Sequence, residues 1–168
     1  MSRSTYDTDI LEWSEQQAAA LRDLSRTPQG RSNELDLEHV AEEIEDVGRS
    51  ELMAVQSFVR QILVHVVKAV SAPDATSVLH WRKEVVGFHN DLLDRMTPSM
   101  PARINVSKLW QRAMRQAEAD LAVYGQALAS GLPQECPFTI AEITASDFDF
   151  MSAVDVLCQR IAAASDRN

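Results

Sequence analysis

One stripe of apolar residues runs through positions 37 to 70 with the period of an α-helix. At 100° per residue, nine side chains fall within one half of the helix surface: Leu37, Val40, Ile44, Val47, Val55, Phe58, Ile62, Val66 and Ala69. The stripe keeps its phase across Gly48-Arg49-Ser50, so it predicts one helix about 50 Å long, with a break at Gly48 as the alternative. Such a face must be buried against other helices, which favours an all-α bundle.

Shorter stripes and turn signals predict the remaining helices. They cover residues 8–24, 76–96 and 107–128, a short segment after Pro137, and a tail with Phe150, Val154, Leu157 and Ile161 at helical spacing. Asp7 or Asp9 can cap the first helix and Ser107 the helix at 107–128, while Thr139 and Glu142 form a capping box. The turn-rich residues 27–33 indicate a flexible connection.

Composition agrees with this fold and limits the function. The chain has 168 residues, 45% of them apolar, and only five Gly and six Pro. We therefore predict a single all-α domain over 1–168: four main helices, a short helix and a docked C-terminal helix. A net charge of -9 argues against nucleic-acid binding held by phosphate contacts. The polar N-terminus and the absence of a long apolar run predict a cytoplasmic protein without membrane contact.

Charge is distributed unevenly along the chain. Segment 34–51 has eight acidic residues and one basic residue, and Glu38, Glu42 and Glu45 share the face opposite the apolar stripe with Arg49, which can pair with Glu45. Between positions 95 and 117 there is no acid, and Lys108, Arg112 and Arg115 share one face. We interpret the acidic face as solvated and the basic strip as its intramolecular complement, with docking of a protein partner as the alternative for both.

Polar residues inside the apolar stripe are candidate site residues. Glu51 lies at the middle of the stripe and His65 at its edge, and a buried carboxylate needs a partner such as Lys68, Arg82 or a histidine. A catalytic or metal cluster would gather these residues with Glu43 and His89. We favour a structural role, because the Glu-x-x-His pairs typical of di-metal bundles are absent, and we predict no metal and no cofactor.

The other histidines and the cysteines carry weaker signals. His39 precedes Glu42 and Glu43, and His89 precedes Asp91 and Asp94, at spacings that also suit a metal ligand. An acidic helix produces such pairs by chance, so we expect solvent-facing residues. Cys136 and Cys158 lack a CxxC partner set, and both are predicted to be reduced, unreactive thiols.

Several segments together resemble the bacterial family called Domain of Unknown Function 29. The resemblance covers about residues 6–148 and rests on these segments: Tyr6-Asp7-Thr8-Asp9, Trp13, the block from Glu34 to Glu51, the block from Leu63 to Lys68, the block from Glu135 to Ile140, and Asp147-Phe148. It implies an almost entirely helical protein of undetermined activity and gives no catalytic residue. Residues 149–168 depart from the family pattern, which predicts an extra amphipathic tail particular to this protein.

The function favoured by these patterns is that of a non-enzymatic interaction or adaptor protein using oppositely charged helix faces. It implies a protein partner, and a homo-oligomer is a further possibility. The alternative is a hydrolase or metal-dependent enzyme with a Glu/His cluster inside the bundle. Nucleic-acid binding rests on Lys108, Arg112 and Arg115 alone.

Overall fold

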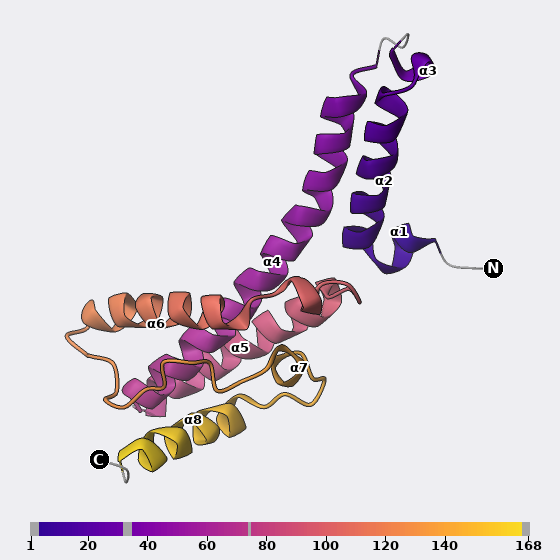
Figure 1. Cartoon of the computed structure of the whole chain (residues 1–168). Coiled ribbons are helices and arrows are strands. Elements are labelled where there is room, and N and C mark those ends of the chain that lie inside the picture. Colours follow the sequence, from indigo (N-terminus) through magenta and orange to yellow (C-terminus); the bar gives the residue numbers. More distant parts are fainter. Residues whose placement is uncertain (1–3, 32–34, 74, 166–168) are drawn as a thin grey trace. The chain divides into compact units, whose positions relative to one another are not determined.

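The computed structural model describes residues 4–31, 35–73 and 75–165, and in this part of the chain the regular secondary structure is helical, without a strand. Five helices have seven residues or more: α2 Ile10–Ser25, α4 Leu37–Ser71, α5 Ala75–Arg95, α6 Val106–Ala122 and α8 Phe150–Ser165 (Figure 1). The short helices are α1 Thr5–Thr8, α3 Pro28–Arg31, the 3₁₀-helix Pro101–Arg103 and α7 Ile140–Ile143. The predicted all-α class, the unbroken long helix and the docked tail helix are confirmed.

Contacts group the chain into two compact units. Unit 1 consists of Met1–Val55 with Arg95–Arg103, and unit 2 consists of Gln56–Asp94 with Ile104–Asn168. Helix α4 contributes residues to both units. The assignment of residues 1–168 to a single domain stays a prediction.

Helix α4 is also, among the described helices, the one long and apolar enough to cross a membrane. Half of the residues in its most apolar window are buried within the protein. The cytoplasmic location and the absence of membrane contact stay predictions.

In unit 1, helices α2 and α4 approach each other at Gly48. A Cβ atom on Gly48 would lie 2.0 Å from Ser14 Oγ and 3.0 Å from Leu11 Cα, so this close packing requires glycine. The buried row of α4 here is Leu37, Ala41, Gly48 and Val55. Each of Val40 and Val47 precedes a member of this row by one residue, about 100° around the helix, and is exposed. Their predicted place in the core was therefore wrong.

Asp9 joins the start of α2 to residues 97–99 within unit 1. Its carboxylate caps α2 by accepting the Glu12 N–H at 3.1 Å. It also accepts the Thr97 hydroxyl at 2.9 Å, and the N–H and hydroxyl of Ser99 at 2.7 and 2.8 Å. Asp9 is one of the two caps predicted for this helix, and with 4% exposure it is fully satisfied in a buried position.

In unit 2, the second half of α4 is buried on most of its circumference. Ile62, Leu63, Val64, Val66 and Val67 are all at most 1% exposed. Other helices pack their apolar faces in this unit through Trp81, Val85 and Leu92 of α5, Leu109, Trp110, Ala113, Ala117 and Leu121 of α6, and Phe150, Val154 and Leu157 of α8. The core of unit 2 therefore surrounds α4.

Three predicted boundaries were wrong. Helix α6 ends at Ala122 and not near 128, because Gly125, with φ 68°, closes it: the N–H groups of Gly125 and Gln126 bond to the carbonyls of Ala122 and Leu121. Asn105, not Ser107, caps α6 by accepting the Lys108 N–H at 2.9 Å. Residues 28–31 form the short helix α3 instead of a flexible connection, while residues 32–33 of that stretch lie outside the described residues.

Candidate functional site

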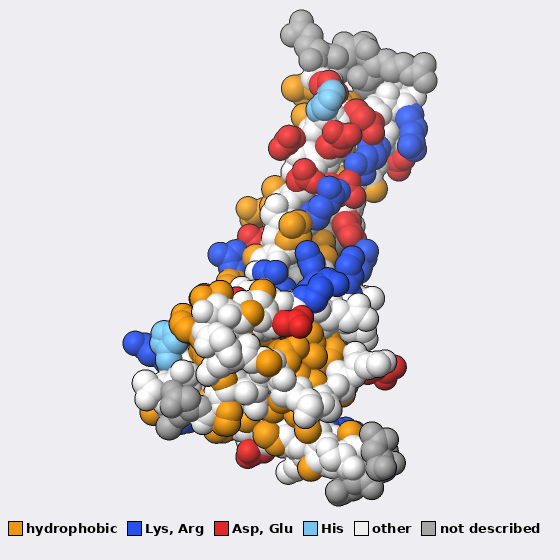
Figure 2. Space-filling model, turned by 90° about the vertical axis from the view of Figure 1, so that its left-hand side faces the viewer, with side chains coloured by type: hydrophobic (Ala, Val, Ile, Leu, Met, Phe, Trp, Pro, Cys, Tyr) orange, Lys and Arg blue, Asp and Glu red, His pale blue; other side chains and the backbone are white. Residues whose placement is uncertain are grey.

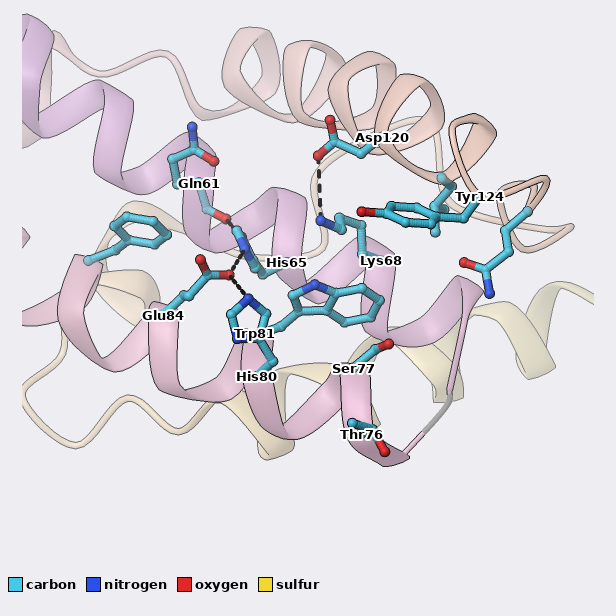
Figure 3. A pocket seen from close by; sticks show the side chains of 13 residues that line it. Gln61, His65, Lys68, Thr76, Ser77, His80, Trp81, Glu84, Asp120 and Tyr124 are labelled. Atoms are coloured by element: carbon cyan, nitrogen blue, oxygen red, sulfur yellow. Dashed lines mark hydrogen bonds and ion pairs between the residues drawn. The ribbon is translucent and has the colours of Figure 1, made fainter.

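A pocket of about 680 Å³ opens in unit 2 and is lined by polar and aromatic side chains (Figure 3). Helix α4 contributes Gln61, His65 and Lys68, which are spaced by one turn and therefore share one face. Helix α5 contributes His80, Trp81, Glu84 and Phe88, and α6 contributes Asp120, with Tyr124 in the turn that follows. Two sets of charged groups therefore face one cavity.

The first set centres on the Glu84 carboxylate. His65 Nε2 lies 2.9 Å from Glu84 Oε2, and His80 Nε2 lies 3.4 Å from the same oxygen. His65 Nδ1 is 2.7 Å from the carbonyl oxygen of Gln61, which can only accept, so this nitrogen carries a hydrogen. Both ring nitrogens of His65 are therefore engaged, Nδ1 by the Gln61 carbonyl and Nε2 by the Glu84 carboxylate.

The second set is formed by Lys68 and Asp120. Lys68 Nζ lies 3.5 Å from Asp120 Oδ2 and 4.8 Å from the centroid of the Trp81 ring. The Lys68 side chain is 15% exposed, so its stem is buried and its ammonium group faces the pocket. Figure 3 shows the Tyr124 hydroxyl pointing toward the same ammonium group. One long contact to Asp120 leaves other N–H groups of Lys68 available.

This geometry leaves the Glu84 carboxylate as an acceptor and the Lys68 ammonium group as a donor, both open to the pocket. The contacts of Glu84 with both histidines involve Oε2, so Oε1 is available on a side chain that is 40% exposed. Within the described residues, no group of three or more His, Cys, Asp or Glu side chains is arranged to hold a metal ion. The arrangement suits recognition of a polar molecule through complementary charges.

Residues 5–149 match the sequence profile of the family described as Domain of unknown function DUF29. The chain belongs to this family. The DUF29 protein is also similar to an α-helical protein of unknown function from Rhodospirillum rubrum ATCC 11170, known from a crystal structure. The two are 45% identical with a TM-score of 0.85, over 93% of this chain and 99% of the other.

Because the similarity covers 93% of this DUF29 protein, it includes at least part of residues 149–168. The assignment of this segment as an extra amphipathic tail stays a prediction. A search of curated proteins gives no match. The family resemblance inferred from the sequence is confirmed, and the activity of the family is unknown.

The structure brings two of the six candidate cluster residues into the pocket, namely His65 and Lys68. Glu43 lies in unit 1 and is exposed. Glu51, also in unit 1, pairs with Arg95 at 2.9 Å and is half-exposed, so its expected partners were wrong. Arg82 is exposed on α5 and lines other hollows of unit 2.

His89 is the buried histidine that the solvent-facing interpretation missed. It is 7% exposed and stacks on Phe148 of the same unit, with ring centroids 5.1 Å apart. Its Nε2 is buried and, within the described residues, has no hydrogen-bond partner. His39, by contrast, is exposed as expected, and its hydrogen bond with Asp36 raises the His39 pKa.

The acidic face of α4 is partly neutralised within unit 1. Arg22 of α2 lies 2.6 Å from Glu45 and 3.5 Å from Glu38, and its hydrogen bond lowers the pKa of Glu45. The expected Glu45–Arg49 pair is replaced by Arg49 with Asp46 at 2.9 Å. Glu42 is exposed, whereas Glu34 lies outside the described residues. Figure 2 accordingly shows basic side chains among the acidic ones toward the top of the view.

The basic strip lies on α6 in unit 2. Lys108, Arg112 and Arg115 are all exposed, and within the described residues none of them forms an ion pair. Arg22 pairs with Glu38 and Glu45 of the acidic face within unit 1. The basic strip as the complement of that face stays a prediction. The inert interpretation of Cys136 agrees with its pKa, which burial raises to about 11.

Sequence reasoning missed Glu84, His80 and Asp120. Glu84 lies 19 residues from His65, and Asp120 lies 52 residues from Lys68, so helix packing and not local spacing brings these pairs together. One local signal was available, because His80 and Glu84 are four residues apart on α5 and therefore share a face.

Proposed function

We propose that this DUF29 protein binds a small polar molecule in the pocket of unit 2, with Glu84 as acceptor and Lys68 as donor. The observation that supports this proposal is that the Glu84 carboxylate has one oxygen engaged and, within the described residues, the other free of protein partners. Both histidines contact Oε2, which fixes the carboxylate, and Oε1 stays free inside a cavity of about 680 Å³. Fixed but unsaturated polar groups in a concave pocket are typical of ligand sites.

His65 acts as a positioning residue in this proposal. Its Nδ1 is held by the Gln61 carbonyl and its Nε2 by Glu84, so neither nitrogen is free to bind a ligand. The His65 side chain is 8% exposed and therefore shielded from water, which strengthens its hydrogen bond with Glu84. Catalysis by a Glu/His cluster stays a prediction, since binding needs only the contacts described.

A thermal-shift screen of the purified chain tests the proposal. The probes are a panel of small amines, carboxylic acids, amino acids and sugars at millimolar concentration. We expect at least one probe to raise the melting temperature by mass action, and Glu84→Gln to abolish the effect. Glu118→Gln is the matched control, because Glu118 is an exposed glutamate of α6 that does not line the pocket.

Two results of this screen count against binding in the pocket. One is a panel in which no probe changes the melting temperature of the unmodified chain. The other is a stabilising probe that acts equally on the Glu84→Gln and Glu118→Gln variants, because such a probe binds elsewhere.

A second candidate function is docking of an acidic protein partner on α6. The specific observation is that Lys108, Arg112 and Arg115 are exposed and free of ion pairs within the described residues. A fluorescent poly-glutamate peptide should bind more weakly to Arg112→Glu than to Lys83→Glu, a matched charge reversal of an exposed residue on α5. The difference should shrink as salt rises. Equal binding by the two variants would remove this candidate.

A further inference from the structure

We infer that the ligand of the unit 2 pocket is a small zwitterion, with an ammonium and a carboxylate group on one short carbon skeleton. This inference rests on the proposed binding function and specifies the ligand class. The amino acids, including those with the amine at the far end of the chain, belong to this class.

The pocket holds charged groups of both signs. Its carboxylates are Glu84 and Asp120, and its ammonium group is Lys68. A carboxylic acid alone would place its negative charge near the two carboxylates, and an amine alone would place its positive charge near Lys68. A zwitterion can offer each of these groups a partner of opposite sign.

Glu84 and Lys68 do not pair with each other. Within the described residues, Glu84 pairs with the two histidines and Lys68 pairs with Asp120, and no ion pair joins Lys68 to Glu84. Lys68 is one helical turn from His65, which holds Glu84, so the donor and the acceptor open into the same cavity. A bifunctional molecule can therefore contact both ends at once.

The walls between these ends suit a carbon skeleton. Trp81 is 9% exposed and Leu121 is 1% exposed, and Phe88 lines the same cavity. The Tyr124 hydroxyl, which points toward Lys68 in Figure 3, offers a second donor to a carboxylate bound there. The ligand carboxylate thus lies at Lys68 and Tyr124, and the ligand ammonium at Glu84 Oε1.

Calorimetric titration with matched probes tests the ligand class. The zwitterions are glycine, β-alanine, γ-aminobutyrate and δ-aminovalerate, and the monofunctional controls are the amine and the carboxylic acid with the same number of carbons. We expect one zwitterion to bind about tenfold or more tightly than either of its controls, because each charge-assisted contact contributes about that factor. Equal affinity for the zwitterion and one of its controls would overturn the inference.

Variants assign each charge of the ligand to its contact. Glu84→Gln should lower the affinity of the zwitterion to that of the acid, and Lys68→Met should lower it to that of the amine. Lys68→Gln replaces Lys68→Met if the latter does not fold, as judged by circular dichroism. A zwitterion whose affinity is unchanged in both the Glu84 and the Lys68 variants contradicts the inference.

The outcomes separate this inference from the proposed function. If a sugar or a monofunctional acid binds tightly and depends on Glu84, the pocket is a ligand site and the zwitterion class is wrong. If neither this series nor the wider panel binds, both fail.

Discussion

Two carboxylates, one in each unit, show how differently the same group is used. Asp9 in unit 1 is 4% exposed and accepts four hydrogen bonds, from Glu12, Thr97 and Ser99, through both of its oxygens. Glu84 in unit 2 is 40% exposed and is held through one oxygen only. A fully satisfied carboxylate stabilises the fold, whereas a fixed and unsaturated one can bind something else.

Two glycines, one in each unit, also differ in how closely their surroundings pack. Gly48 in unit 1 lies against Ser14 and Leu11 with no room for a side chain. Gly87 on α5 in unit 2 has no described atom within 4 Å of where its Cβ would lie. A side chain at position 48 would therefore disturb the packing of unit 1, whereas a methyl group at position 87 has open space in unit 2.

The largest effect is expected from Asp9→Ala. The variant loses the cap of α2, about 1 kcal/mol, and leaves the buried donors of Ser99 and Thr97 without an acceptor, which costs about 2 kcal/mol more. Urea unfolding followed by circular dichroism should show a loss of about 3 kcal/mol. Asp7→Ala, at an exposed neighbour, should change stability by less than about 0.5 kcal/mol. Similar losses in both variants would contradict the role assigned to Asp9.

The next effect compares one substitution at two glycines. Gly48→Ala should cost about 2 kcal/mol, because the new methyl group meets the fully buried Ser14 and the backbone of Leu11. Gly87→Ala should stabilise the protein by up to about 1 kcal/mol, since alanine favours a helix and has open space there. Thermal melts of both variants measure the difference, and equal shifts would show that the contact at Gly48 does not limit stability.

Lowering the pH should destabilise unit 1 through protonation of Asp9. The loss of stability should be smaller than the loss caused by Asp9→Ala. Burial by itself would raise the pKa of Asp9, but the hydrogen bonds from Ser99, Glu12 and Thr97 outweigh it and lower the pKa below 3.8. A lowered pKa stabilises the fold fully above about pH 4, and this contribution is lost as the pH falls through the lowered value. The stability gap between the unmodified chain and Asp9→Ala should therefore narrow below pH 3.8. A gap that stays constant down to acid unfolding would argue against this linkage.

Much of the fold could be predicted because helix formation depends on spacing that the sequence shows directly. The unbroken α4 and the Asp9 cap follow from local patterns. The inward face of unit 1 does not, because the contact at Gly48 decides it: a residue without a side chain adds nothing to an apolar stripe, so Val40 and Val47 were assigned to the core. The early end of α6 was missed because the choice between Gly125 and Gly131 depends on backbone conformation.

Part of the candidate site could also be predicted from local patterns in the sequence. His65 and Lys68 interrupt an apolar stripe, which marks them as polar groups that need partners. Their partners Glu84 and Asp120 lie on other helices among many exposed acids, and only packing distinguishes them. Glu51 is also a polar residue within the apolar stripe, but it pairs with Arg95 outside the pocket. A polar residue in such a stripe therefore indicates that it has a partner, but not that it belongs to a functional site.

The smallest effect is expected from Glu84→Gln, and it tests the contrast directly. The amide keeps the shape of the side chain and can donate to His65 Nε2, which then needs no proton, and partly exposed ion pairs contribute little. Stability should change by less than about 0.5 kcal/mol. The same change at Asp9 should cost about 2 kcal/mol, because one oxygen that accepts a buried N–H or hydroxyl becomes a donor facing a donor. Paired urea titrations of Asp9→Asn and Glu84→Gln give both values. If Glu84→Gln lowers the stability as much as Asp9→Asn does, then Glu84 stabilises unit 2 as Asp9 stabilises unit 1. The free oxygen of Glu84 would then no longer be a reason to propose that it binds a ligand.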